Sequence, residues 1–205
     1  NEKVIRNNLI VDEGDPYNKI LTNKSINRLK SLRIFKTVNS EVKEGTEANK
    51  KVLNIEIEEM ATGEISAGAG IGTTGSSVGL GVKERNYLGT GVTLDANIQV
   101  SDDGIKGLFS VMNPNYKNSD NSLFTTVESS TVNKLSTFGY ETSKYGFNIG
   151  TQYEQYEDVF FTPNISVYLE DLKTNSNATS NLKKQTGDYF DITGAYTLLL
   201  DKRDQ

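Results

Sequence analysis

Alternation of apolar and polar residues between Gly63 and Ser101 is the feature that most limits how this chain can fold. In residues 92–101 the even-numbered positions are apolar and the odd-numbered positions are polar. The same alternation places on one face Ile65, Ala67, Ala69 and Ile71. A period of two residues predicts β-strands with one apolar and one polar face. Turn residues between the runs predict an antiparallel meander. We interpret the apolar face as a surface that contacts lipid and the polar face as the wall of a water-filled barrel.

The composition excludes a membrane-spanning helix but not a barrel. Only 35% of the 205 residues are hydrophobic, and no run approaches the roughly 20 apolar residues that such a helix needs. A barrel strand needs only about 9–11 residues, with apolar residues at alternate positions.

Charge and residue usage exclude several classes of function. The net charge is −5 and no basic stripe is present, so we expect no nucleic-acid partner. The chain has no histidine and no cysteine, which removes Ser-His and Cys-His nucleophile pairs and the commonest metal ligand. We therefore expect neither an enzyme nor a bound cofactor or metal. No secretion signal follows Asn1, so an exported protein would contain this chain as an internal piece.

Residues 1–59 follow a different pattern. Apolar spacing predicts an amphipathic helix over residues 16–32, beginning at Asp15-Pro16, and the end of a shorter helix before it. Two strands are predicted next, over residues 34–42 and 52–58. Two helices and two strands are too few elements to form an independent hydrophobic core easily.

A family resemblance rests on two motifs in this region, E-G-D-P-Y at Glu13–Tyr17 and R-L-x-x-L-x-x-F at Arg28–Phe35. They resemble the last POTRA domain before the barrel in BamA-like outer-membrane assembly factors. A POTRA domain has the order strand, helix, helix, strand, strand, so the resemblance implies that the opening strand is missing here. We place residues 1–59 as the C-terminal part of that domain and residues 60–205 as the N-terminal half of the barrel.

Eight strands are predicted after Met60. Beyond the three between Gly63 and Ser101, they cover residues 105–113, 122–132, 140–153, 161–172 and 189–200. The turns at residues 87–91, 113–121 and 153–160 would lie in the periplasm. Those at residues 73–75, 102–104, 133–136 and 173–188 would lie outside the cell. Aromatic residues that we predict to form a girdle at the periplasmic ends are Tyr87, Tyr116, Tyr153, Tyr156, Phe160 and Phe161.

The resemblance continues through this half. N-Y-L-G-T-G within Glu84–Gly91 resembles the family's N-x-L-G-x-G turn, Asn113-Pro114 resembles its N-P turn, and residues 201–204 resemble its D-x-R-D segment. The family has sixteen barrel strands, so the remaining half, with an inward-folded loop, would lie past Gln205.

The first predicted barrel strand is the candidate site. Residues 70–75 satisfy G-x-G-x-x-G, but a strand rather than a helix follows, which argues against a dinucleotide site. The family resemblance implies that this strand borders the barrel seam, where unpaired backbone groups could pair with an incoming strand. Plain packing of small residues is the alternative. The residues assigned to strand pairing are Gly63, Ile65, Ala67, Gly68, Ala69, Gly70, Ile71 and Gly72.

Two other groups of charged residues have simpler interpretations. Asp102-Asp103-Gly104 is a hairpin signal rather than a paired-carboxylate site. In the family, the last POTRA domain contacts a periplasmic lipoprotein subunit, which implies partner-binding roles for Arg6 and Glu13. The alternative for Glu13 is a solvated charge beside a helix.

The prediction is a mainly β protein, a truncated α+β POTRA domain followed by an antiparallel transmembrane meander. The resemblance implies that it folds and inserts β-barrel precursors in the bacterial outer membrane, without ATP. Implied partners are unfolded precursors, lipoprotein subunits and the bilayer. The alternatives are a TamA-like factor, a two-partner secretion transporter, or a passive pore or structural barrel.

Overall fold

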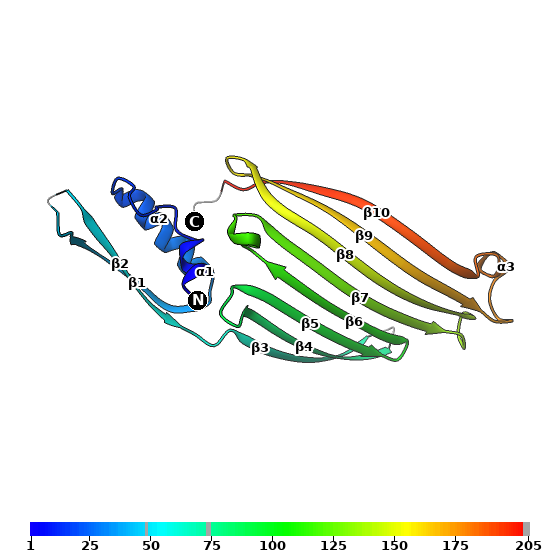
Figure 1. The fold of residues 1–205 in the computed structure, drawn as a ribbon. Coiled ribbons are helices and arrows are strands. Elements are labelled where there is room, and N and C mark those ends of the chain that lie inside the picture. Colours follow the sequence, from blue (N-terminus) through cyan, green and yellow to red (C-terminus); the bar gives the residue numbers. More distant parts are fainter. Residues whose placement is uncertain (48, 73–74, 203–205) are drawn as a thin grey trace.

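The computed structural model describes residues 1–47, 49–72 and 75–202 and consists of a small α/β part joined to one large sheet (Figure 1). The helices are α1 (Glu2–Arg6), α2 (Lys19–Ser31), the 3₁₀ turn η1 (Tyr116–Asn118) and α3 (Ser180–Lys183). The strands of the small part are β1 (Phe35–Glu44) and β2 (Lys51–Glu59). Those of the large sheet are β3 (Gly63–Gly72), β4 (Gly75–Tyr87), β5 (Val92–Ser101), β6 (Gly104–Asn113), β7 (Ser122–Lys134), β8 (Tyr140–Tyr156), β9 (Val159–Thr174) and β10 (Gly187–Leu200).

The large sheet is an antiparallel meander, as the alternation predicts. Its order is β10-β9-β8-β7-β6-β5-β4-β3, so each strand pairs with its neighbours in sequence, and β3 and β10 are the two edges. The eight strands do not close on themselves, because these two edges do not pair with each other. What the structure establishes is an open, eight-stranded meander.

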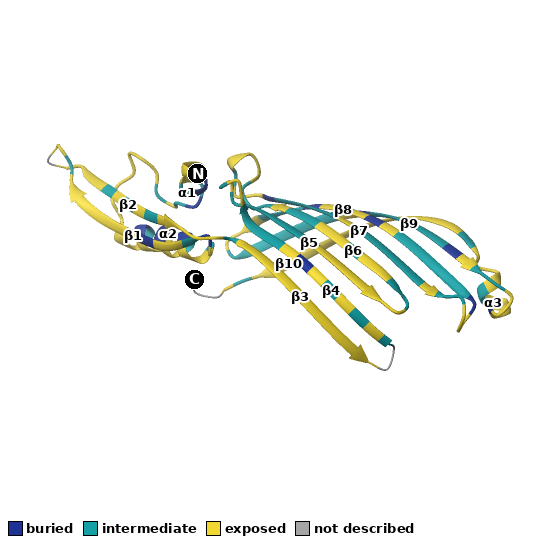
Figure 2. Ribbon diagram, turned by 90° about the horizontal axis from the view of Figure 1, so that it is seen from below, coloured by how far each residue is buried: buried dark blue, intermediate teal, exposed yellow. Residues whose placement is uncertain are grey.

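The core of the described chain lies almost entirely in the small part. Ile26 and Leu29 of α2 pack on Val38 of β1, and residues from both helices and β2 surround them. Outside the small part, the buried apolar residues among those described are Leu172 of β9 and Ala178 of the β9–β10 loop. The sheet is therefore a single layer with no second sheet or helix packed on its faces (Figures 1 and 2).

Register places most apolar residues of the eight strands on one face of this layer. Ile65 lies opposite Val82, which lies opposite Ala96, which lies opposite Phe109. The same row continues through Val127 and Phe147 to β9 and β10. Apolar side chains of this face that remain more than 40% exposed include Ile65, Ile71, Val78, Leu80, Val82, Ile98, Ile105, Phe109, Val127, Phe147, Ile165, Phe190, Ile192 and Leu198. The predicted separation of an apolar and a polar face is confirmed.

Several predicted boundaries were wrong. α2 does not begin at Asp15-Pro16 but at Lys19, because the Asn18 side chain accepts hydrogen bonds from the backbone N–H groups of Ile20 and Leu21. Such an N-cap fixes the first turn of a helix. The turn predicted over residues 153–160 consists only of Glu157 and Asp158, since β8 and β9 are longer than the strands predicted from the sequence. The turn predicted at residues 133–136 lies at 135–139, and the loop predicted at 173–188 contains α3.

The two parts contact each other at one end of the sheet. The turns after β4, β6 and β8 lie at the end that faces α1 and α2 (Figure 1). The Arg28 guanidinium of α2 lies 2.9 Å from the Asp120 carboxylate in the β6–β7 turn, and the Asn8 amide donates to Asn115 Oδ1 at 3.4 Å. The six aromatic residues of the predicted girdle lie at this same end of the sheet, or in its turns. No helix among the described residues is long and apolar enough to cross a membrane.

Candidate functional site

The strand assigned to partner pairing, β3, lies at one edge of the sheet. It pairs with β4 alone, and each of its residues from Gly63 to Gly72 is exposed (Figure 2). The structure therefore places all the strand-pairing residues predicted from the sequence on one free edge. Residues 73 and 74, which belong to the G-x-G-x-x-G pattern and the predicted turn, lie outside the described residues, as do residues 203 and 204 of the D-x-R-D segment.

Two hydrogen bonds define the direction in which the backbone groups of β3 point. Next to the pair Gly63–Glu84, the Thr62 carbonyl accepts a hydrogen bond from Arg85 N–H at 3.4 Å and so points toward β4. At the other end, Ser76 of β4 lies opposite Ile71. The Ser76 carbonyl points away from β3, toward β5, and accepts a hydrogen bond from Asp102 N–H at 3.2 Å. Successive residues of an antiparallel strand direct their N–H and C=O groups to opposite sides.

It follows that the even-numbered residues of β3 bond to β4. The residues whose N–H and C=O groups point to the open edge are Gly63, Ile65, Ala67, Ala69 and Ile71. Unpaired rows of this kind are templates for another strand.

Side-chain contacts fix the two ends of the β3–β4 hairpin. At the base, Glu84 accepts from the Thr62 hydroxyl and from Asn86 N–H, and the Arg85 guanidinium lies 2.9 Å from Glu64. At the tip, the Asp102 carboxylate accepts from Ser76 N–H at 2.8 Å and from its hydroxyl.

The bonds to Ser76, of which the backbone bond is the stronger cause, lower the pKa of Asp102 below its ordinary value. Between these ends, a Cβ built at Gly68 would meet no heavy atom within 4 Å. The middle of β3 is thus held by backbone bonds to β4.

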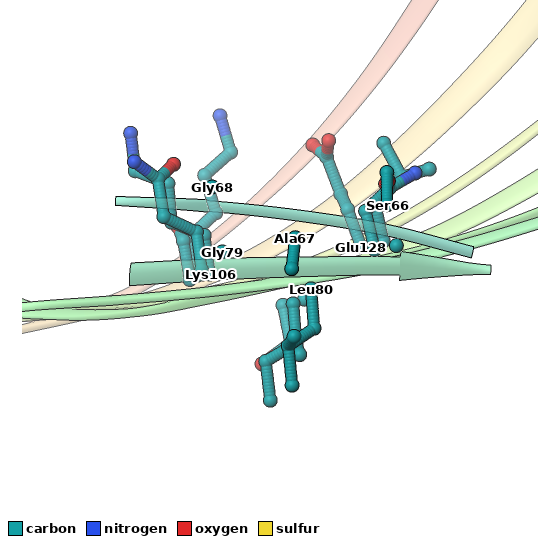
Figure 3. A pocket seen from close by; sticks show the side chains of 16 residues that line it. Ser66, Ala67, Gly68, Gly79, Leu80, Lys106 and Glu128 are labelled. Carbon is teal, nitrogen blue, oxygen red and sulfur yellow. The ribbon is translucent and has the colours of Figure 1, made fainter. Parts of the chain in front are cut away.

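The polar face of the sheet forms a groove of about 730 Å³ that begins at β3 and reaches β8. Figure 3 shows Ser66, Lys106 and Glu128 pointing to this side of the sheet, whereas Leu80 points to the other. The Lys144 ammonium lies 4.1 Å from the centre of the Tyr168 ring, a cation–π contact on the same face. The sequence alone did not indicate this groove. Its polar residues occupy the alternate positions of the strands, but only the register shows which of them meet.

Arg6 and Glu13, predicted to bind a partner, lie together at the surface. Arg6 Nη1 is 2.9 Å from Glu13 Oε1, and Arg6 Nε is 2.7 Å from Glu2. Hydrogen bonds to Glu2 and then to Glu13 raise the pKa of Arg6. The pair is exposed and so contributes little to stability. Among residues 1–47, 49–72 and 75–202 no group of three or more acidic, histidine or cysteine side chains could hold a metal ion.

The architecture is shared with the barrel portion of known outer-membrane proteins. A crystal structure of BamA from Haemophilus ducreyi lacking POTRA domains 1–3 superposes with a TM-score of 0.75 and 18% sequence identity, over 97% of this chain and 40% of that one. CdiB from Acinetobacter baumannii superposes with a TM-score of 0.58 and 12% identity, over 97% of this chain and 39% of that one. No protein-family model and no curated protein sequence matches. At these identities the likeness concerns the fold, and the chain spans about 40% of either structure.

Proposed function

We propose that this chain is part of a BamA-like factor that inserts β-barrel precursors into the bacterial outer membrane, with β3 pairing to an incoming strand. Residues 1–59 would be the C-terminal part of its last POTRA domain, in the periplasm, and residues 60–205 half of its barrel. The observation that carries the proposal is a free, fully exposed edge strand on a sheet with one apolar face.

The apolar face supports a bilayer as the surroundings of the sheet. Ile71 is 94% exposed and Ile192 is 65% exposed, and a contiguous apolar surface of this size requires a covering phase. The apolar row of β10 runs from Phe190 to Leu200. At about 3.3 Å per residue and a tilt of about 40°, its height is about 25 Å, which is that of the apolar band of outer-membrane barrels.

The edge of β3 supports strand pairing as the mechanism. In a bilayer, each unpaired N–H or C=O group is costly, because no water replaces the missing bond. An added strand bonds to the outward groups of the odd-numbered residues, and this exchange needs neither ATP nor a covalent step. The contact of Glu84 with Thr62 and that of Asp102 with Ser76 hold the two ends of the hairpin, while the outer edge of β3 stays available.

Cysteine crosslinking tests the proposal. The chain has no native cysteine, so Ser66→Cys or Gly70→Cys introduces a single thiol on β3. With a stalled barrel precursor that carries one cysteine in its terminal strand, we expect disulfide adducts at both positions. Ser130→Cys, on the same polar face but on the interior strand β7, is the matched control and should give none.

Adducts at Ser130 but not on β3 would contradict strand pairing at this edge. Absence of adducts at every position would favour a passive pore or a structural barrel, the readings that do not require an open edge.

The exposed pair Arg6–Glu13 is a proposed contact for a periplasmic lipoprotein subunit. Its support is the position of both charges on the small part, away from the sheet edge. Glu13→Lys should abolish co-purification of such a subunit, and Glu41→Lys on β1, also exposed, should not. Equal loss with both variants would exclude a specific role for Glu13.

A further inference from the structure

Where the groove on the polar face meets the free edge, it is lined by glycines and so has no side chains to fill it. Gly68 of β3 lies directly opposite Gly79 of β4, and Gly79 lies opposite Gln99 of β5. A Cβ at Gly68 would have no heavy atom within 4 Å, and one at Gly79 would meet only the Ile98 carbonyl oxygen, at 3.7 Å. The first side chain in this row is therefore that of Gln99, two strands in from the edge. Figure 3 shows Gly68 and Gly79 beside each other in the groove.

Elsewhere on the same face, a glycine is covered by a ring from the adjacent strand. Gly146 of β8 lies opposite Tyr168 of β9, and a Cβ at Gly146 would come within 2.6 Å of the Tyr168 ring. Gly150 is covered in the same way, since its Cβ would come within 2.3 Å of the Phe124 ring. Large side chains that lie across glycine positions protect the backbone and stabilise strand pairing.

Gly146 and Tyr168 form a non-hydrogen-bonded pair, and a residue of an added strand that lies opposite Gly68 would form a pair of the same kind. Asn175 N–H donates to the Gly139 carbonyl, so the odd-numbered residues of β9 bond to β8 and Tyr168 faces Gly146 in a non-hydrogen-bonded pair. In such pairs the two Cα atoms are about 4.5 Å apart, closer than in the bonded ones. Because the odd-numbered residues of β3 point outward, a residue opposite Gly68 on an added strand would also be in a non-hydrogen-bonded pair.

We propose that Gly68 and Gly79 form a slot that selects a large aromatic side chain, tyrosine in particular, on the polar face of the strand that pairs with β3. The proposal rests on the proposed function and specifies its substrate. From an added strand to Gln99 is three strand spacings, about 14 Å. A tyrosine ring on the added strand lies across Gly68, and its hydroxyl extends toward Gly79. Its hydroxyl points toward the polar wall of the groove, which includes Gln99 and Lys106. A small residue at this position of the added strand would leave the glycine backbone uncovered by any side chain.

Competition between two peptides tests the slot on the 205-residue chain in detergent micelles. Both are synthetic ten-residue strands with alternating leucine and polar residues. They differ at one polar-face position, tyrosine or alanine, and carry a cysteine two residues after it. Antiparallel pairing then places this cysteine opposite the thiol of Ser66→Cys when the variable residue lies opposite Gly68. We expect about three- to fivefold more disulfide adduct with the tyrosine peptide, the range of a favourable cross-strand pair.

Two further variants separate the slot from general effects of a larger residue. Gly68→Val, made with Ser66→Cys, fills the slot and should reduce the ratio of adducts to about one, while the alanine peptide still reacts. Gly107→Val is the matched control, because Gly107 lies on the apolar face of the interior strand β6 and also has open space around it. It should leave the ratio unchanged.

Each alternative outcome has a distinct meaning. Equal adducts with both peptides, or an unchanged preference in Gly68→Val, would overturn the slot and leave strand pairing intact. Absence of adducts with either peptide would contradict the proposed function itself, and the slot with it.

Discussion

Single residues of this chain occupy two different environments. Leu29 is fully buried in the small α/β part, where apolar side chains avoid water by packing on one another. Ile65 and Ile71 are 82% and 94% exposed on the large sheet. Aliphatic side chains are therefore buried in the small part and exposed on the large sheet, where the proposed function requires a bilayer to cover them.

Leu29→Ala should destabilise the small part by about 2–5 kcal/mol, because it leaves a cavity that Ile26 and Val38 cannot fill. Ile20→Ala, on the same helix but 69% exposed, should change stability by less than about 0.5 kcal/mol. Urea unfolding followed by the helical circular dichroism signal measures both. Equal effects would show that the core is not centred on Leu29.

Asp102 gives a prediction for acid pH. Its pKa is lowered by the bonds from Ser76, so its stabilising effect on the hairpin tip is complete above the ordinary aspartate pKa of about 3.9. The effect is lost as the pH falls through the lower pKa of the folded state. An NMR titration of the Ser76 amide should show a midpoint below the ordinary value, and Asp102→Asn should remove the titration. A midpoint at or above the ordinary value would contradict the bond.

At the scale of elements, contacts at the ends determine where each element begins and ends. The Asn18 side chain starts α2, and the Thr62, Glu84 and Ser76 contacts fix the ends of the β3–β4 hairpin. Between these ends, a Cβ at Gly68 would meet no heavy atom within 4 Å.

Asn18→Ala should cost the helix about 1 kcal/mol, because two N–H groups of its first turn lose their acceptor. Asn18→Asp keeps an acceptor oxygen at the cap and should retain most of the stability. Thermal unfolding monitored at the helical circular dichroism band distinguishes the two. A larger loss in the aspartate variant would exclude capping as the role of Asn18.

At the scale of the whole molecule, the large sheet and the small part are held together by few contacts. The ion pair Arg28–Asp120 joins α2 to the β6–β7 turn, and the bond Asn8–Asn115 joins the segment after α1 to the same turn. A Cβ at Gly91 would lie 3.4 Å from the Val4 side chain, so the β4–β5 turn also abuts α1. These contacts place the small part at the end of the sheet where the predicted aromatic girdle lies.

Ile192→Lys should weaken insertion of the chain into phospholipid vesicles by about 2–4 kcal/mol if the apolar face contacts hydrocarbon. Thr193→Lys, one residue along β10 and on the polar face, should have little effect. Partitioning between urea solution and vesicles measures both variants. Equal losses would contradict the assignment of the two faces.

The sequence by itself determined which side chains of each strand share a face and how many strands follow Met60. Both depend on local geometry, because successive side chains of a strand point to opposite faces whatever the strand pairs with. It also indicated the candidate residues of β3, but not their backbone direction.

The tertiary structure decided everything that depends on register and on residues distant in sequence. These include the ring of Tyr168 over Gly146, the carboxylate of Asp102 at Ser76, the docking of α2 on Asp120 and the open state of the sheet. Alternation determines a face but not a partner, so a row of side chains across neighbouring strands exists only after the strands have paired.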